Sequence, residues 1–423
     1  MTDVGGATAR WGAHDQDDPF PVMARLQAEG AVHPVTLADG HAAWLVLGYE
    51  AARAALNDRR LSKDMHAALA RDADIVAEGL PGPALARHML NVDAPDHTRL
   101  RRLVSGAFTH RRVEAMQPRI AAIVDDLLDA IAAGDPDRPV DLVASFAFPF
   151  PFTVICHMLG IPEPDRDPFG TELRALVDAP EHGRARRAAA AVIEMLDELL
   201  AHKRRSPGDD LVSALIAARD GADRLSEQEL RSTIFQLVVA GHDTTTNLIG
   251  NGVVALHRRP DQLEALRADP RRIVPAVEEL LRFDPPAHHA TFRYAVADVE
   301  IAGSTIPAGA QVLVCLAAAN RDPGRFADPQ ALDVGRADQR HIAFGHGIHH
   351  CLGAGLARLE ARTALGSLIR RFPRMRIAVP FDQLRWSHGD GVVLRGLAEL
   401  PVVPGRTGNG ATDPIVSTRR RAT

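Results

Sequence analysis

The stretch that decides the fold runs from Phe344 to Gly353 and reads FGHGIHHCLG. Its glycines allow the backbone to fold closely around one cysteine, Cys351, so that amide N–H groups can point at the sulfur. The following segment, 352–371, is rich in Ala, Leu and Arg and predicts a helix. The positive end of such a helix lowers the pKa of a nearby thiol. The pattern therefore predicts a thiolate metal ligand at Cys351.

Cys351 has two alternative roles. A lone cysteine is most often a small buried hydrophobic residue, and that role suits Cys156 and Cys315. A zinc site is the second alternative, because histidines are dense around Cys351. Structural zinc favours paired cysteines with short spacers, and the chain has none. The histidines in question are His341, His346, His349 and His350.

The composition is that of an ordinary globular protein. Of 423 residues, 46% are hydrophobic and 24% charged, and the net charge of −5 argues against a nucleic-acid partner. No run of about 20 apolar residues is present, so we expect no membrane span. Residues 1–18 are polar and acidic, unlike a signal peptide. Three widely separated cysteines do not form a disulfide framework, and we expect a reducing cytoplasm.

Helical periodicity dominates the chain and predicts a mainly α fold with small β-sheets. A capping box at 226–229 opens a helix that can run to His257. At 1.5 Å per residue, about 31 residues give roughly 47 Å, which is long enough to cross the molecule. Val32–Leu37 and Ala43–Leu47 flank Asp39-Gly40 and predict a hairpin. We expect one domain over residues 1–403 and a disordered tail over 404–423.

Local sequence patterns also predict the structure of several other segments. The pattern predicts a long loop over 68–92, a helix over 113–133, and a charged, irregular segment over 166–188. Short strands are predicted within 299–316 around two glycines.

The long helix contains an unusual polar stretch. Its apolar run 234–240 is broken by Gly-His-Asp-Thr-Thr-Thr at 241–246. Polar groups in a buried helix are costly unless satisfied, and threonine hydroxyls can bond to carbonyls one turn back. A solvated face or a kink would also explain the stretch.

Two charged pairs are ambiguous when taken alone. Glu279 and Arg282 are three residues apart on a helix, a spacing that usually marks a surface pair. His97 and Arg101 place two donors on one helix face, and two adjacent donors suit a carboxylate. A basic surface helix is the commoner meaning of the second pattern.

Taken together and in this order, these motifs resemble the cytochrome P450 family over roughly residues 20–403, and in particular its soluble actinobacterial members that tailor natural products. The resemblance implies the cytochrome P450 fold, with haem between the long central helix and the helix after the Cys351 loop. It assigns iron ligation to Cys351 and proton delivery to Asp243 and Thr244. It leaves the position of His242 free, and we assign that residue no role.

The resemblance also implies how haem b is held. Phe344 and Gly345 belong to the ligand loop, and Ala240 and Gly241 would make room for the haem face and O2. The residues implied to contact the haem propionates are His97, Arg101, Arg293 and His349. Glu279, Arg282 and Arg336 match the structural triad of the family, with a role in folding and haem retention.

The implied activity is monooxygenation, either hydroxylation or epoxidation, of a medium-to-large and mostly neutral secondary metabolite such as a macrolide. Electrons derived from NAD(P)H would arrive through a separate ferredoxin and its reductase, and we expect a cytoplasmic monomer. Two alternatives are a haem-thiolate enzyme that uses peroxide or couples substrates oxidatively, and a non-catalytic haem sensor. The Asp243–Thr244 pair argues for the O2 route.

Two surfaces follow from the same interpretation. The substrate would be contacted by segments 76–92, 168–186, 236–240, 287–291 and 387–393. A basic docking patch for the ferredoxin would comprise Arg99, Arg102, Arg111, Arg112, Arg358 and Arg362.

Overall fold

The computed structural model describes residues 9–12, 18–64, 67–68, 83–177, 182–218, 225–387 and 392–406. The predicted tail lies outside them from residue 407 onward. The helices are α1 Phe20–Glu29, α2 Tyr49–Asn57, α4 Asp96–Ser105, α5 His110–Ala115, α6 Gln117–Ala132, α7 Pro149–Leu159, α8 Glu163–Val177, α9 His182–Arg205, α10 Leu211–Ala218, α11 Glu227–Arg258, α12 Pro260–Ala268, α13 Ile273–Phe283, α14 Leu316–Ala319 and α15 Ala354–Arg371.

The strands are short and form small sheets, as predicted. A six-stranded sheet has the order β1-β2-β3-β9-β6-β4, and the predicted hairpin is its β2–β3 pair, with Val32 opposite Val46. The strands are β1 Ala9–Trp11, β2 Val32–Leu37, β3 Ala42–Val46, β4 Leu61–Ser62, β5 Val140–Asp141, β6 Arg293–Ala295, β7 Val299–Ile301, β8 Ser304–Ile306, β9 Gln311–Val314, β10 Arg376–Ile377, β11 Trp386–Ser387, β12 Gly396–Leu397 and β13 Pro401–Val403.

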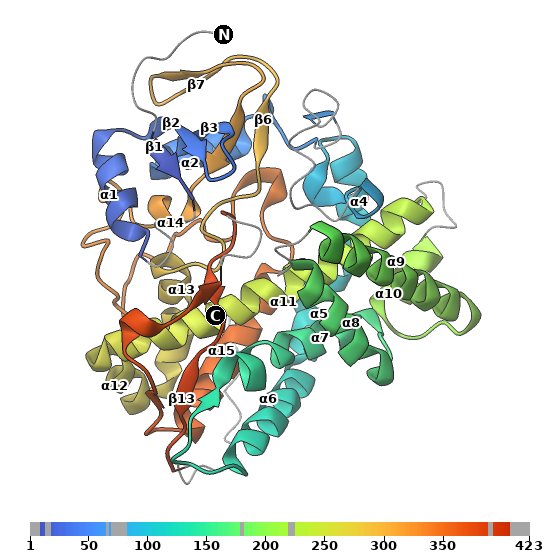
Figure 1. Ribbon diagram of the computed structural model, residues 1–423, viewed down its shortest axis with the longest axis vertical. Coiled ribbons are helices and arrows are strands. Elements are labelled where there is room, and N and C mark those ends of the chain that lie inside the picture. Colours follow the sequence, from blue (N-terminus) through green and yellow to red (C-terminus); the bar gives the residue numbers. More distant parts are fainter. Residues whose placement is uncertain are drawn as a thin grey trace, which may run out of the picture.

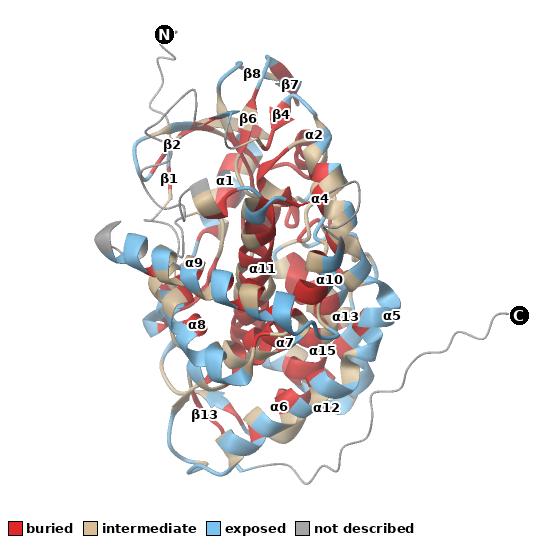
Figure 2. Cartoon of the chain, turned by 90° about the vertical axis from the view of Figure 1, so that its right-hand side faces the viewer, coloured by how far each residue is buried: buried red, intermediate tan, exposed pale blue. Residues whose placement is uncertain are grey.

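The long helix α11 crosses the molecule, as the sequence predicts (Figure 1). Its capping box is formed, because the Ser226 hydroxyl accepts from the Glu229 amide and the Glu229 carboxylate accepts from the Ser226 amide. Seen from the side, α11 is buried along most of its length (Figure 2). The main sheet gathers at one end of the molecule with α1 and α2, whereas α8, α9 and α10 lie at the other side (Figure 1).

α11 joins two hydrophobic cores. Residues 230–238 pack into a core with α7, α9 and α10, and residues 248–256 pack into a second core with α6, α13 and α15. Residues 240–247, all of which are described, belong to neither core. The polar stretch predicted in this helix therefore lies where the two cores meet, and the apolar residues on either side hold it in place.

Two sequence expectations were wrong. The segment predicted as irregular over 166–188 is largely helical, since α8 runs to Val177 and α9 begins at His182; residues 178–181 lie outside the described chain. The apolar residues Phe169 and Leu173 are buried at helical spacing, and their packing outweighs Pro168 within α8. The single helix predicted over 113–133 is two helices, because Pro118 in the first turn of α6 lacks the N–H that would continue α5.

The predicted loop over 68–92 is described from residue 83 onward. It contains two short 3-10 turns, Pro83–Leu85 and Met89–Asn91, and residues 69–82 lie outside the described chain.

Candidate active site

The Cys351 loop closes tightly on itself. The Cys351 amide donates to the Phe344 carbonyl at 2.9 Å, and Gly345 and Gly347 have φ values of 71° and 76°. These left-handed conformations favour glycine. At Gly347 a Cβ atom would also collide with the side chain of Asn57, the last residue of α2. The loop leads through Gly353 directly into α15.

The electrostatic surroundings of Cys351 differ from the sequence prediction. Burial raises the pKa of its thiol, and this effect outweighs the Gly353 amide and the charges of Arg101 and Arg358, which lower it. Cys351 is nevertheless an exposed residue, whereas Cys156 and Cys315 are buried. The helix end alone therefore does not make Cys351 a thiolate. A metal cation would, because coordination deprotonates a thiol.

Donor groups from distant parts of the chain meet near this loop. The rings of His97 in α4 and His349 in the loop lie 4.3 Å apart, centroid to centroid. Burial, together with nearby positive charges, lowers the pKa of His349 to about 2; the charges are those of His97, Lys63, Arg293 and Arg101. Arg101 itself donates to the His350 carbonyl at 2.8 Å.

Lys63 is a member of this group that the sequence analysis missed. Its side chain is buried, and its ammonium donates to the Thr291 hydroxyl and, at 3.0 Å, to the Phe292 carbonyl. The chain contains only two lysines, Lys63 and Lys203, among many arginines, and both are buried. That rarity is the signal that could have indicated Lys63.

Several donors in this group lack a partner. Within the described chain, both ring nitrogens of His97, Nε2 of His349 and Nε of Arg293 are buried without a hydrogen bond. Buried polar groups are nearly always paired. We define the donor cluster as His97, Lys63, Arg293 and His349; its chemistry fits an anion with two carboxylates.

The polar stretch of α11 presents an open face at one point. Ala240 is exposed, although Val238 and His242 on the same helix are buried. The Thr244 hydroxyl donates to the Ala240 carbonyl at 2.9 Å, as expected for a threonine within a helix. Gly241 faces α7, where a Cβ atom would lie 3.2 Å from the side chain of Ile155. Its small size therefore serves helix packing.

The Asp243 carboxylate contacts the preceding residue, His242. One carboxylate oxygen, Oδ1, lies 3.0 Å from Nε2 of His242, whereas Oδ2 is buried and has no hydrogen-bond partner among the described residues. The carboxylate is therefore oriented on one side and available on the other.

Glu360, on α15, is a second buried acid near this stretch that the sequence analysis did not identify. It accepts a hydrogen bond from the Thr245 hydroxyl at 3.1 Å. Burial raises the pKa of its carboxyl to about 8, and Thr245 only partly offsets this. At neutral pH Glu360 is therefore a neutral acid that holds a proton next to α11.

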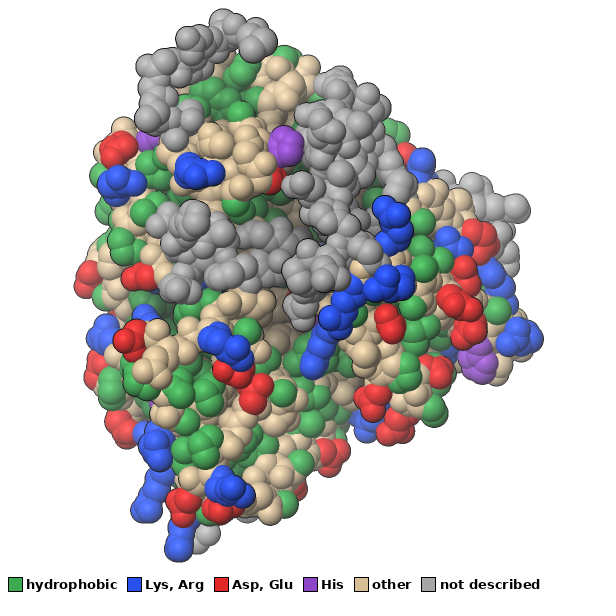
Figure 3. All heavy atoms as spheres, viewed as in Figure 1, with side chains coloured by type: hydrophobic (Ala, Val, Ile, Leu, Met, Phe, Trp, Pro, Cys, Tyr) green, Lys and Arg blue, Asp and Glu red, His purple; other side chains and the backbone are tan. Residues whose placement is uncertain are grey.

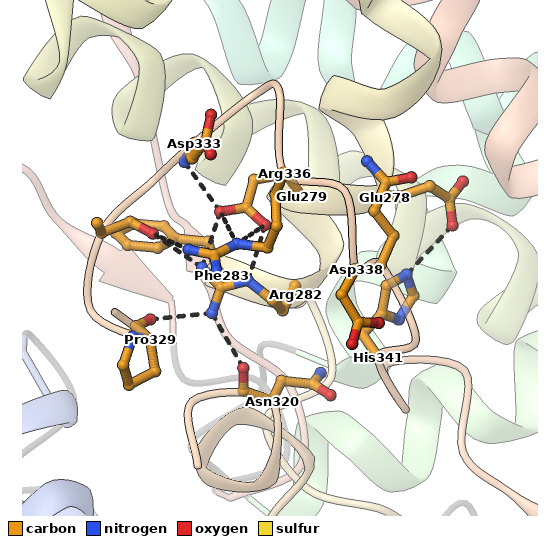
Figure 4. Close-up of polar contacts among 12 residues, drawn as sticks. Glu278, Glu279, Arg282, Phe283, Asn320, Pro329, Asp333, Arg336, Asp338 and His341 are labelled. Atoms are coloured by element: carbon orange, nitrogen blue, oxygen red, sulfur yellow. Dashed lines mark hydrogen bonds and ion pairs between the residues drawn. The ribbon is translucent and has the colours of Figure 1, made fainter. Parts of the chain in front are cut away.

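The Glu279, Arg282 and Arg336 side chains form one buried network (Figure 4). The Arg282 guanidinium donates to both Glu279 oxygens at 2.7 and 2.8 Å and to the carbonyls of Asn320, Pro329 and Ala331. All five of its N–H groups are thus used. Arg336 donates to Glu279 at 3.1 and 3.2 Å. The network fixes the segment 320–336, which leads into the cysteine loop.

The predicted docking patch is only partly available. Arg358 and Arg362 donate inward to Glu278, at 2.8 and 3.3 Å, and Arg99 donates to Glu229. These guanidinium groups are held by carboxylates of the chain itself. Arg111 and Arg112 are exposed. On the face shown in Figure 3, acidic and basic side chains are mixed.

Two of the predicted substrate segments lie side by side. Ala287 and His289 pair with residues 392–394, and His289 is fully used because it bonds to the Val392 carbonyl at 2.6 Å and accepts from the Trp11 indole at 3.2 Å. Parts of three segments, 76–82, 178–181 and 388–391, lie outside the described residues.

The structure does not support a metal ion held by several protein side chains, such as the zinc site named as an alternative for Cys351. Within the part of the chain that the structure describes, no three His, Cys, Asp or Glu side chains are grouped so that they could hold a metal ion. The same residues contain no helix that is long and apolar enough to span a membrane.

Comparison with known proteins identifies the family. The family model for cytochrome P450 matches residues 171–376. Cytochrome P450 107B1 of Saccharopolyspora erythraea is 48% identical over 390 residues, which cover 90% of this chain and 94% of that protein. The chain belongs to the cytochrome P450 family.

Other cytochromes P450 agree over nearly the whole chain. Mycinamicin IV hydroxylase/epoxidase of Micromonospora griseorubida is 43% identical over 382 residues, which cover 89% of this chain and 94% of the relative. The solved structure of the P450 monooxygenase TamI bound to tirandamycin C superposes with a TM-score of 0.86 at 46% identity, covering 93% of this chain and 99% of that one. The chain is therefore an oxidoreductase of the P450 monooxygenase type, and its family implies haem, O2 and electrons derived from NAD(P)H.

The residues present fit a haem. Haem carries two propionates, which match the unpartnered donors of the donor cluster, and its iron would supply the cation that the Cys351 thiol requires.

The Glu279 network should dominate local stability. Glu279→Gln leaves two guanidinium groups without their carboxylate and should reduce the free energy of unfolding by about 3–5 kcal/mol. The matched change at the exposed Glu264, which pairs with Arg267, should reduce it by less than about 1 kcal/mol. Denaturant unfolding followed by tryptophan fluorescence measures both. Equal losses would contradict the network's role; if Glu279→Gln does not fold, Arg336→Gln takes its place.

The buried acid Glu360 should make stability depend on pH. The pKa of the Glu360 carboxyl is about 8 in the folded protein and 4.5 ordinarily. Its contribution to the free energy of unfolding is therefore complete below pH 4.5 and is lost as the pH rises toward 8. Glu360→Gln abolishes this loss. Relative to the parent, the variant should gain about 2 kcal/mol between pH 6 and pH 8. Glu264→Gln, measured in parallel, gives the baseline for a surface carboxyl. A constant difference between Glu360→Gln and the parent would contradict the raised pKa.

Proposed function

We propose that this chain is a haem b monooxygenase that inserts one atom of O2, by hydroxylation or epoxidation, into a medium-to-large and mostly neutral secondary metabolite of the polyketide or macrolide type. The observation that carries the proposal is the Asp243–Thr244 pair next to the exposed face of α11 at Ala240. The relatives that act on mycinamicin IV or bind tirandamycin C support the substrate class.

In this proposal the chain holds haem from two sides. Cys351 would ligate the iron, and His97, Lys63, Arg293 and His349 would hold the propionates. Arg101 would act at longer range, since its guanidinium already binds the His350 carbonyl. When bound, the haem supplies the redox chemistry, and the thiolate ligand favours cleavage of the O–O bond.

The residues of the chain would manage protons. Thr244 carries a hydroxyl that now donates to Ala240 and can turn to donate toward the open face of α11. Asp243 has one oriented oxygen and one without a partner, and a fifth of its side chain is exposed to solvent. A carboxyl so placed can take a proton from water and pass it to Thr244.

Electrons would come from a ferredoxin and its reductase. Of the six arginines predicted to dock this partner, we retain three in the proposal because they are exposed, namely Arg102, Arg111 and Arg112. Three free thiols suit a reducing cytoplasm. We also propose that residues 1–403 act as one domain.

Replacement of Thr244 tests the proposal. Because positioned proton transfer contributes roughly 10²–10⁴-fold to a reaction, Thr244→Ala should lower product formed per NAD(P)H by about tenfold or more, with the electrons appearing as hydrogen peroxide. Thr246→Ala, a threonine two positions further along the helix, is the matched control.

The measurement uses a compound selected from a panel by the spectral shift it causes on binding. Unchanged coupling in Thr244→Ala would argue against O2 activation through this pair and would favour the peroxide-using or oxidative-coupling alternative. Absence of any substrate-dependent turnover in the parent would favour a haem sensor.

A further inference from the structure

His242 lies one residue before Asp243 in α11, where the family motif leaves the residue free. Only 2% of its side chain is exposed. The rings of Phe148 and Phe152 meet its ring edge to face at centroid distances of 5.2 and 5.6 Å. The imidazole is therefore held in one orientation by two aromatic residues, Phe152 in α7 and Phe148 at the N-terminal cap of that helix.

The two ring nitrogens of His242 face two acceptors. Nδ1 lies 2.8 Å from the Val238 carbonyl oxygen, and since a carbonyl only accepts, Nδ1 carries a hydrogen. Nε2 lies 3.0 Å from Oδ1 of Asp243. A neutral imidazole has only one N–H group, and an ionised carboxylate has none to donate.

A further proton must therefore occupy the contact between His242 and Asp243. It is bound either to Nε2, which makes an ion pair, or to Oδ1, which makes a neutral pair. Without it, two lone pairs would face each other at 3.0 Å away from water. Such a contact is strongly unfavourable in a buried site.

The surroundings agree with a retained proton. Burial and the charge of Arg174 lower the pKa of His242, but the charge and hydrogen bond of Asp243 and the Val238 carbonyl outweigh them, so its pKa is raised. Arg174 of α8 is a cation near this site, and its guanidinium carbon lies 3.5 Å from the ring centroid of Phe148.

We propose that His242 and Asp243 together store one exchangeable proton next to Thr244, with His242 as the positioning residue. This inference rests on the proposed function. In delivery, the proton moves from Nε2 to the Asp243 carboxyl and leaves from there, so the pair ends as a neutral imidazole and a carboxylate. Solvent then restores one proton through the partly exposed Asp243 side chain.

Nuclear magnetic resonance tests the stored proton directly. The experiment uses the reduced, CO-bound holoenzyme, which is diamagnetic, with ¹⁵N-labelled histidine, and assigns the His242 signals by comparison with His242→Gln. Between pH 5 and pH 8 the ring of His242 should lose no proton in the parent. In Asp243→Asn the ring should lose its proton at a lower pH than in the parent. A midpoint at or below about 6.5, the value of a free histidine, in the parent would overturn the proposal.

Turnover provides the second measurement. His242→Phe keeps the aromatic packing but removes the proton, so product per NAD(P)H at pH 8 should fall by about tenfold. It should recover as the pH falls to 6, because a lone carboxyl must take each proton from solvent, and the solvent isotope effect should rise. A fall that does not depend on pH would indicate a purely structural role and overturn the proposal. His157→Phe, the same change at an exposed site on α7, is the control.

Asp243→Asn separates the two proposals. If Asp243→Asn leaves coupling intact, proton delivery by this pair is wrong, and both the proposed function and this inference fail. If Asp243→Asn uncouples the enzyme and His242→Phe does not, only the role of His242 is overturned.

Discussion

The structure depends on a concentration of buried positive charge and donor groups that the chain does not balance by itself. Lys63, His97, Arg293 and His349 come from four segments that are far apart in the sequence, and they converge on one place. The carboxylate acting on three of them is Asp93, which already accepts from Ser62 and the Lys63 amide. Bringing such groups together is unfavourable unless an anion joins them. A dianionic haem satisfies this requirement, and its iron meets the requirement of Cys351 for a cation.

The rest of the fold brings the two sides of the site together. α11 is fixed at both ends by separate hydrophobic cores, and its central residues, which belong to neither core, carry the polar groups. On the other side, the Glu279 network fixes segment 320–336, and the closed loop 344–351 follows from it. The two sides of the site are thus held by different means, apolar packing for α11 and a buried polar network for the segment before the cysteine loop.

The sequence predicted best those features that depend on residues close together in the chain. The cysteine loop, the capping box of α11 and the β2–β3 hairpin each depend on residues a few positions apart, and the structure has all three elements. Lys63 and Glu360 were missed because their importance arises from burial beside segments more than a hundred residues away. The lowered pKa expected for Cys351 was wrong because burial of its thiol outweighs the Gly353 amide and the nearby arginine charges. Arg358 and Arg362 were placed on a free surface because Glu278, which binds them, is about eighty residues earlier in the chain.

The central claim is that Cys351 presents its sulfur to a haem held by the donor cluster. The absorption spectrum of the reduced, CO-bound protein tests it most directly, because thiolate ligation shifts the main haem band to longer wavelength than histidine ligation does. The parent and Cys315→Ala, a change at a buried thiol in the sheet region, should both show the shifted band, and Cys351→Ala should lack it. A shifted band in Cys351→Ala, or a histidine-type band in the parent, would contradict the claim.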